Sequence, residues 1–246
     1  MTEPSPVFAP YSGLNYRSAK RFLAEQFREA DLPFADEDAL ELVLGLSGLD
    51  HAGYIAKGTE FVATDLLSQL RNAAARRLGG EPIDRILGWR DFYGRRFTID
   101  NVLSPRGDTE VLLLAALKAF SNYDTPRALE LGTGSGALAI TLLSECEDAT
   151  LLATDIDPAA LATATANAKT HGVTKRITLQ QSDWFANIEE TGFDAILSNP
   201  PYITDAAMQA LPKDVAEFDP DCALRGGNDG LDAYEIIIPD ALNHLR

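Results

Sequence analysis

The sequence predicts an α/β protein in which a Rossmann-like parallel sheet follows a small helical N-terminal domain. From residue 127 onward, short apolar segments typical of buried strands alternate with helix-like segments. A glycine-rich run joins the first of these strands to the helix after it, whereas residues 1–80 show apolar residues at helical spacing only. Because alternating strands and helices build parallel sheets with right-handed crossovers, the sheet is expected in the second part of the chain.

The N-terminal region is predicted to contain three short helices. The first covers residues 15–30. Asp36 is expected to cap the second helix, and Thr64 is expected to cap a third that Gly79-Gly80 would close. None of these segments carries a pattern typical of catalysis. Residues 1–80 are therefore predicted to be a small helical domain.

Residues 81–103 are predicted to be a β-hairpin linker to the sheet domain, residues 104–246. Their β-favouring stretches lie around Phe92-Tyr93 and residues 97–99, and glycines at 88 and 94 mark turns. Arginines gather in and before this linker, which indicates either a solvated face or a docking surface for an acidic partner. They are Arg71, Arg76, Arg77, Arg85, Arg90, Arg95 and Arg96.

The sheet is expected to contain four strands joined by helices. The expected strands are residues 127–131, 150–154, 177–180 and 193–198, and the expected helices are residues 137–145 and 158–170. A proline near the first turn supports the second of these helices. After the fourth strand, only one more helix is predicted, residues 232–245.

The glycine-rich run indicates a nucleotide-type ligand at the first strand end. It reads Gly132-Thr133-Gly134-Ser135-Gly136, and glycines there let the backbone turn sharply and approach a ligand. Asp155 ends the second strand, nineteen residues beyond Gly136, where a carboxylate suits ribose hydroxyls. This pattern alone fits both NAD and S-adenosylmethionine.

Two further features favour S-adenosylmethionine. Glu130 places a carboxylate before the glycines, which is unfavourable beside a pyrophosphate but suits cationic sulfonium and ammonium groups. After the third strand, Asp183 can accept from an adenine amino group, and Trp184 can pack on the ring face. Trp184 is also compatible with a purely core role.

The fourth strand runs into Asn199-Pro200-Pro201-Tyr202, the most specific signal in the sequence. Ligands of such sheets bind at the carboxyl ends of the strands, where this loop lies. The Asn199 side-chain oxygen and the Pro200 carbonyl could each accept one N–H of a planar amide, and Tyr202 could stack on its face. The prolines stiffen the loop. This arrangement predicts methylation of a planar, weakly nucleophilic nitrogen.

From about residue 80 to 235 the chain resembles the HemK/PrmC family of protein N5-glutamine methyltransferases. The shared motifs are Glu81-Pro82-Ile83, Gly88, Phe92, Gly94, Pro105-Arg106-Gly107-Asp108-Thr109-Glu110, the glycine run, Asp155, Ser182-Asp183-Trp184-Phe185 and Asn199-Pro200-Pro201-Tyr202. The resemblance implies a Rossmann-like S-adenosylmethionine methyltransferase sheet, with a helical N-terminal domain for substrate recognition. It also implies that the protein partner is a class I peptide chain release factor.

The resemblance also implies roles for individual residues. Catalysis would rest on Asn199, Pro200 and Tyr202, and the glutamine would be held by residues 199–202 with Arg106. The residues expected at the cofactor, from the motif and the resemblance together, are Glu130, Gly132, Thr133, Gly134, Ser135, Gly136, Asp155, Asp183, Trp184 and Asn199. S-adenosylhomocysteine would be the product, and no metal is expected.

Two departures from the family stand out. The family usually has proline where this chain has Gly107, and its sheet continues beyond the point where this sequence ends. The sheet is therefore expected to be C-terminally truncated. Residues 193–198 would then form an edge strand, and the chain would be less stable and prone to self-association.

Charge and composition limit the alternatives. The sequence carries a net charge of -16, with 13 basic and 17 acidic residues in 1–110 but 8 and 20 in 111–246. This acidic second part opposes binding to a phosphate backbone, which counts against direct nucleic-acid binding and an adenine-N6 methyltransferase. An NAD-dependent dehydrogenase would need a proton-transfer residue near the nicotinamide, and the three histidines of this sequence lie in no recognisable constellation. A non-catalytic protein on a degenerate methyltransferase fold stays open.

The remaining sequence features predict a cytoplasmic protein. Residues 1–13 show no basic stretch followed by an apolar one, so no secretory signal is expected. No apolar run reaches the ~18 residues that span a bilayer, so no membrane association is expected. The two cysteines, Cys146 and Cys222, suit a reducing compartment.

Overall fold

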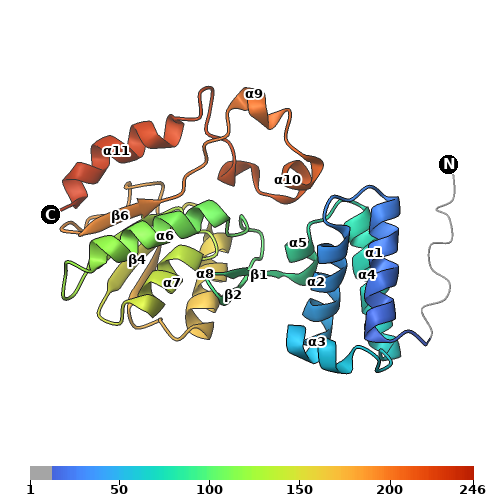
Figure 1. The fold of residues 1–246 in the computed structure, drawn as a ribbon. Helices are drawn as coiled ribbons and strands as arrows, with labels where there is room; N and C mark the ends of the chain where they lie inside the picture. The colour runs from blue at the N-terminus through green and yellow to red at the C-terminus, as the bar shows by residue number, and fades with distance from the viewer. Residues whose placement is uncertain (1–12) are drawn as a thin grey trace. The chain divides into compact units, whose positions relative to one another are not determined.

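The computed structural model describes residues 13–246 and divides into two compact units. The first ends at Leu87, and the second runs from Gly88 to Arg246 (Figure 1). The expectation that the chain starts without a secretory signal concerns residues that lie almost wholly outside the described part. Within residues 13–246, no helix combines the length and apolar character needed to cross a bilayer.

The first unit is a helical bundle. Its helices are α1 (Tyr16–Glu29), α2 (Ala35–Ser47), α3 (His51–Lys57), α4 (Thr64–Leu78) and α5 (Ile83–Leu87). Leu23, Phe27, Leu42 and Leu70 are fully buried and pack in one cluster, as their helical spacing predicts. Asn15 caps α1 by accepting a hydrogen bond from the Ser18 backbone N–H at 2.8 Å.

The two predicted N-terminal helix caps, Asp36 and Thr64, are wrong. Helix α2 begins at Ala35, so Asp36 lies in its first turn, where its carboxylate pairs with Lys20 and Arg28 of α1. Helix α4 begins at Thr64 itself, with Ala63 at the cap position and no side-chain capping bond. Both side chains suit a cap, but Asp36 instead forms tertiary ion pairs that no local pattern encodes. The sequence interpretation also missed α3 and α5, because segments of seven and five residues show little periodicity.

Most of the arginines between residues 71 and 96 form ion pairs with carboxylates of their own structural unit. The ion pairs are Arg76–Glu81, Arg77–Asp38, Arg95–Glu145 and Arg96–Asp91. The Arg77–Asp38 pair is largely buried, with 2.7 Å between Nε and Oδ2. The Arg96 guanidinium also lies 3.3 Å from the centre of the Trp89 ring. These charges already have partners, which leaves little free positive charge for an acidic protein.

The second unit opens with a hairpin of β1 (Trp89–Phe92) and β2 (Arg95–Thr98). Tyr93 and Gly94 have φ values of 48° and 71° at its tight turn, the geometry that two-residue hairpins favour. The buried Asn167 side chain donates to the Thr98 carbonyl at 2.9 Å and to the Ser135 carbonyl at 2.8 Å. One amide therefore ties the hairpin to the glycine-rich loop.

The main sheet has four parallel strands in the order β5-β4-β3-β6. They are β3 (Arg127–Leu131), β4 (Thr150–Asp155), β5 (Ile177–Gln181) and β6 (Ala195–Ser198). The parallel sheet predicted from the strand–helix alternation is confirmed, with three strands starting at the predicted residues. The order places β3 beside both β4 and β6, so the chain reverses its winding direction around β3.

Helices cover both faces of the sheet (Figure 1). One face carries α6 (Gly107–Phe120), α7 (Ala137–Glu145) and α8 (Pro158–Thr170), and the other carries α11 (Asp232–His244). Ala128 packs on the first face and its neighbours Leu129 and Leu131 on the second, as alternation along a strand requires. The segment between β6 and α11 contains α9 (Asp205–Met208), α10 (Lys213–Phe218) and a 3₁₀ turn (Asp221–Ala223).

The fourth strand differs from its predicted extent. β6 begins at Ala195, because Phe193 instead makes a parallel bridge with Leu245. The Phe193 N–H donates to the His244 carbonyl at 3.0 Å, and the Arg246 N–H donates to the Phe193 carbonyl at 3.1 Å. Among the described strands β6 lies at one edge of the sheet, and α11 ends at His244, one residue earlier than predicted.

Candidate active site

The candidate active site lies where the carboxyl ends of the strands meet. The glycine-rich loop follows β3, Asp155 ends β4, and Asn199 follows β6. Because β3 is paired with both β4 and β6, these segments reach the same edge of the sheet. In α/β sheets the ligand crevice forms at the point where the winding direction changes, and here that point lies beside β3.

The glycines of the loop have distinct surroundings. Gly132, Gly134 and Gly136 have φ values of 70°, 55° and 78°, a conformation that favours glycine. A Cβ atom on Gly132 or Gly134 would meet nothing within 4 Å. On Gly136 it would lie 2.8 Å from the Ile140 side chain and 3.2 Å from Ala164. Two glycines thus leave open space, and the third lets helices α7 and α8 approach the loop.

Asp155 holds the glycine-rich loop in place. Its carboxylate accepts a hydrogen bond from the Gly134 N–H at 2.8 Å and one from the Asp157 N–H at 3.0 Å. Burial raises the pKa of the Asp155 carboxyl, while these backbone donors act in the opposite direction. Asp155 therefore connects the end of β4 to the loop after β3 and still lines the cavity between them.

Glu130 supports the same loop from inside the protein. It is only 4% exposed, and its carboxylate accepts a hydrogen bond from the Thr133 hydroxyl at 2.6 Å. Burial raises the pKa of Glu130 to about 8. Glu130, Thr133, Ser135 and Gly136 were all predicted to contact the cofactor, but none of them lines the cavity. Their positions suit a supporting role for the loop.

A cavity of about 270 Å³ opens in front of the loop. Its walls include Gly132, Gly134, Asp155, Ile156, Asp157, Asp183, Trp184, Asn199, Pro200 and Pro201. Three of these side chains are carboxylates, and no lysine or arginine lines the cavity. Such walls suit an adenosyl ligand with a cationic centre and oppose the charge of a pyrophosphate. The residues present therefore fit S-adenosylmethionine.

Trp184 enters this cavity from an unusual backbone position. Its φ is 48°, a left-handed conformation that is uncommon for a bulky residue. The buried Ser182 hydroxyl donates to the Trp184 carbonyl at 2.8 Å and accepts from the Asn187 N–H at 3.1 Å. These bonds hold the turn that brings Asp183 and Trp184 to the cavity. The structure thus places both predicted residues beside the glycine loop.

A second cavity, of about 290 Å³, adjoins the first. It is lined by Leu103, Arg106, Asp108, Asn199, Pro200, Tyr202, Ile203, Leu211, Val215, Ala223 and Leu224. Leu103, Asn199, Pro200 and Ala223 line both cavities. The predicted acceptor residues Arg106, Asn199, Pro200 and Tyr202 are therefore brought together, whereas Pro201 faces the first cavity. Asn199 and Pro200 stand where the two cavities meet.

The loop after β6 is packed tightly against a second glycine-containing segment, residues 226–230. The Gly226 N–H donates to the Ile203 carbonyl at 2.8 Å, and the Ile203 N–H donates to the Leu224 carbonyl at 2.9 Å. A Cβ atom on Gly226 would lie 2.7 Å from the Tyr202 Cα, and one on Gly230 would lie 2.4 Å from the Tyr202 carbonyl oxygen. Only glycine allows this close approach.

Several lining residues were missed in the sequence. Pro220, Cys222 and Ala223 line the first cavity from a segment that has no periodic pattern and lies about twenty residues beyond the acceptor loop. Arg106 anchors this segment, because its Nη2 lies 2.5 Å from the Asp219 carboxylate. The one available signal was the group of glycines at 226, 227 and 230, which marks a tight backbone path.

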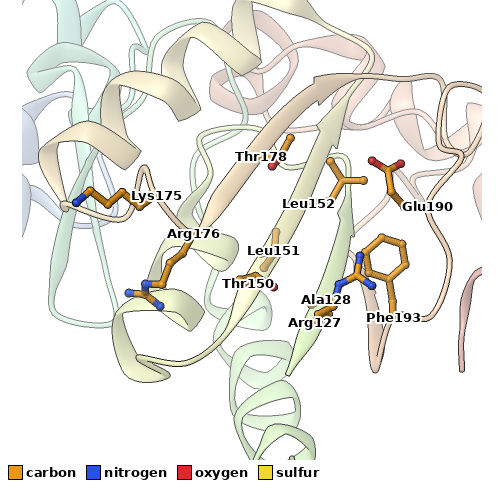
Figure 2. Close-up of a pocket in the computed structure, with 10 residues that line it drawn as sticks. All are labelled: Arg127, Ala128, Thr150, Leu151, Leu152, Lys175, Arg176, Thr178, Glu190 and Phe193. Atoms are coloured by element: carbon orange, nitrogen blue, oxygen red, sulfur yellow. The ribbon is translucent and has the colours of Figure 1, made fainter. Parts of the chain in front are cut away.

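Another cavity, of about 170 Å³, lies at the opposite end of the strands (Figure 2). Its walls come from the starts of β3, β4 and β5, with Lys175, Glu190 and Phe193 nearby. The Arg127 guanidinium is 5.2 Å from the Phe193 ring, and Figure 2 shows Lys175 and Arg176 on the far side from Glu190. No glycine lines this cavity, and the Asn199 loop is remote from it. Asn199, Pro200 and Tyr202, the residues predicted for catalysis, therefore line the two joined cavities and not this one.

Comparisons with known families define the class. A family model described as the methyltransferase small domain matches residues 108–216. A second, described as the PrmC N-terminal domain, matches residues 18–88. Together with the parallel sheet, these matches identify the chain as an S-adenosylmethionine-dependent methyltransferase by fold.

Similar proteins from three organisms define the family. A release factor glutamine methyltransferase of Bradyrhizobium diazoefficiens is 40% identical over 97% of this chain and 82% of that protein. Proteins of the same description from Cereibacter sphaeroides and Agrobacterium fabrum are 40% and 41% identical, covering 93% and 83% of this chain and 81% and 72% of their own lengths. The chain belongs to the family of release factor glutamine methyltransferases.

Proposed function

We propose that this protein transfers a methyl group from S-adenosylmethionine to the side-chain amide nitrogen of a glutamine in a class I peptide chain release factor. One observation carries the proposal: two cavities, of about 270 and 290 Å³, meet at Asn199 and Pro200. The release factor as acceptor is supported by the description of the relatives and by the motif resemblance. A cytoplasmic location fits this partner and the two free cysteines.

The first cavity would hold S-adenosylmethionine, which supplies an electrophilic methyl group on a sulfonium. Asp155 lies at the end of β4, where its carboxylate can accept from ribose hydroxyls. Asp183 can accept from the adenine amino group, and Trp184 can pack on the ring face. Gly132 and Gly134 leave the space that side chains would fill. Glu130 would act indirectly, by holding Thr133 and the loop.

The second cavity would hold the glutamine. An amide nitrogen is a weak nucleophile because its lone pair is delocalised, so its orientation matters more than its activation by a base. The Asn199 side-chain oxygen and the Pro200 carbonyl would each accept one amide N–H and turn the nitrogen toward the first cavity. Tyr202, which is 53% exposed, can stack on the amide plane. Pro201 stiffens the loop, and Arg106 shapes the outer wall.

Incubation with methyl-labelled cofactor tests this function directly. The acceptors are a class I release factor, the same release factor with each candidate glutamine changed to alanine, and adenine-containing DNA and RNA. Label on a single glutamine, located by mass spectrometry and absent from the matching alanine variant, is the expected result. Label on adenine, or no label on the release factor, would overturn the proposed acceptor. The acidic second part of the chain favours a protein acceptor over DNA or RNA.

Calorimetric titration tests the cofactor separately from the acceptor. S-adenosylmethionine is expected to bind with an affinity on the order of micromolar, and NAD is not expected to bind, because three carboxylates and no basic side chain line the cavity. Binding of NAD but not of S-adenosylmethionine would reject the cofactor assignment. The S-adenosylhomocysteine product serves as a second positive ligand.

A further inference from the structure

A hydrogen bond between two side chains joins the first turn of α6 to the acceptor loop. The Asn199 side-chain nitrogen Nδ2 donates to the Thr109 hydroxyl oxygen at 3.2 Å. The two residues are 90 positions apart in sequence, so this contact is a product of the fold. Both side chains are partly buried. Thr109 does not line either cavity and therefore lies behind Asn199 as seen from the ligand side.

The start of α6 is anchored on two sides. Arg106, at the helix cap, reaches Asp219 beyond α10, with 2.5 Å between Nη2 and Oδ2. The Glu110 carboxylate accepts from the Tyr93 N–H of the hairpin turn at 3.2 Å. The Thr109 N–H donates to the Arg106 carbonyl at 3.0 Å, which closes the first turn. Thr109 is thus held on a rigid element rather than on a mobile loop.

The hydrogen bond to Thr109 determines which atoms of the Asn199 amide are available to the substrate. An asparagine side chain offers two N–H donors on nitrogen and an acceptor oxygen. With Nδ2 bonded to Thr109, the amide plane is fixed, and Oδ1 accepts no hydrogen bond from the residues that the structure describes. The proposed reaction needs this oxygen to accept an N–H of the substrate amide. An amide free to rotate would present its N–H groups to the substrate N–H groups for part of the time, which is a repulsive arrangement.

We propose that Thr109 is a positioning residue for methyl transfer, which fixes the Asn199 amide so that its oxygen faces the acceptor nitrogen. This inference rests on the proposed function of the two cavities. It assigns to the Arg106–Glu110 segment a role beyond lining the pocket: its threonine orients the acceptor loop from behind. Thr109 is therefore expected to affect turnover without affecting the affinity for the cofactor.

A pair of substitutions isolates the hydroxyl. Thr109→Val keeps the shape of the side chain but removes the hydrogen-bond acceptor, and Thr109→Ser keeps the hydroxyl but removes the methyl group. We expect kcat of the valine variant to fall about 10- to 100-fold, since small misplacements of reacting groups have effects of that order. The serine variant is expected to stay within about threefold of wild type. The dissociation constant for S-adenosylmethionine should be unchanged in both.

A spectroscopic measurement keeps this test independent of turnover. The side-chain amide protons of Asn199 are assigned in a ¹⁵N–¹H spectrum by their loss in Asn199→Asp. Their signals should shift and exchange faster with solvent in Thr109→Val but not in Thr109→Ser. Equal kcat values or equal Asn199 signals in the two variants would overturn the inference. If wild type methylates no glutamine, the proposed function fails, and the amide signals still decide whether Thr109 holds Asn199.

Discussion

Residues 132–136 and residues 226–230 are both glycine-containing loops beside the active site, but their glycines meet different surroundings. A Cβ atom on Gly132 or Gly134 would point into open space, whereas one on Gly226 or Gly230 would collide with the backbone of Tyr202. The first loop uses glycine to leave a ligand room. The second uses it to bring two protein segments into contact, which fixes the loop that carries Asn199.

This difference separates binding from positioning. In the proposed function the first loop and Asp155 face the cofactor, so changes there should weaken its affinity. The second loop and Asn199 orient the nucleophile in the same proposal, so changes there should slow methyl transfer at unchanged cofactor affinity. Three substitutions test the separation, and a fourth, Glu130→Gln, tests the buried support of the first loop.

The largest effect is expected for Asn199→Ala on the acceptor side. Removal of the side-chain oxygen that orients the amide should lower the single-turnover rate on the order of 10²–10³-fold. The dissociation constant for S-adenosylmethionine, measured by calorimetry, should change only a few-fold. A single-turnover rate within a few-fold of wild type would show that Asn199 does not orient the nucleophile.

Asp155→Ala is the corresponding change on the cofactor side. Loss of hydrogen bonds to a charged group should weaken cofactor binding by about 1.5–3 kcal/mol, roughly 10- to 150-fold. Asp155→Asn serves as the matched variant, since its side-chain oxygen can still accept from the Gly134 N–H while the charge is gone. Calorimetry on both variants separates loop support from charge. Unchanged affinity in the alanine variant would remove Asp155 from the cofactor site.

Gly230→Ala tests the second glycine loop against a matched control. Gly230 has a φ of 83° and a close contact with the Tyr202 carbonyl, and Gly172 has a φ of 72° with nothing within 4 Å of its Cβ position. Both alanine variants carry similar backbone strain, of order 1 kcal/mol. Only Gly230→Ala should displace the acceptor loop, with kcat about tenfold lower. Equal kcat values for the two variants would mean that the contact does not position the loop.

Glu130→Gln gives the smallest effect, in the pH dependence of stability. The Glu130 pKa is raised to about 8 by burial, so the folded state holds a proton that the unfolded state releases above its ordinary value of 4.5. Stability contributed by the neutral carboxyl is therefore present at low pH and is lost as pH rises toward 8, by at most ~1.4 kcal/mol per pH unit.

Urea denaturation between pH 6 and 7.5 measures this slope. The wild-type free energy of unfolding should fall with pH relative to that of Glu130→Gln, which cannot ionise. Asp155, whose pKa is also raised, is present in both proteins, so the difference reports Glu130 together with its coulombic interaction with Asp155. Parallel pH profiles would show that Glu130 is already ionised in the folded protein, as expected for direct pairing with a cation rather than for burial under the loop.

The sequence predicted the sheet better than it predicted the surroundings of the site. The strands at 127, 150 and 177 begin at the predicted residues, because short apolar runs between glycines and helical segments are a local signal. Helix α6 (Gly107–Phe120) was not predicted from the sequence. The predicted cap at Asp36 is wrong because this carboxylate pairs with Lys20 and Arg28 of another helix. The predicted cap at Thr64 is wrong because α4 begins at Thr64 itself.

The same reason explains what was missed at the site. Residues directly after strands, such as Asn199 and Asp155, were predictable because parallel strands share one carboxyl edge. Cys222 reaches the cavity from a segment without a repeating pattern, and Thr109 reaches Asn199 across 90 residues. Glu130 was expected at the cofactor, but the alternation along β3 directs it into the interior beside Thr133. The local spacing of residues does not predict contacts between segments that are far apart in the sequence.

The narrow junction between the two cavities has a consequence for how such enzymes can diversify. Only Leu103, Asn199, Pro200 and Ala223 line both cavities. Most of the remaining wall of the second cavity comes from residues 202–215, a continuous stretch outside the sheet and the glycine-rich loop that does not line the first cavity. If the second cavity holds the acceptor as proposed, replacing that stretch would change which molecule is modified and leave the walls of the first cavity intact. Chimeric proteins that exchange residues 202–215 between relatives are therefore a practical route to new acceptors.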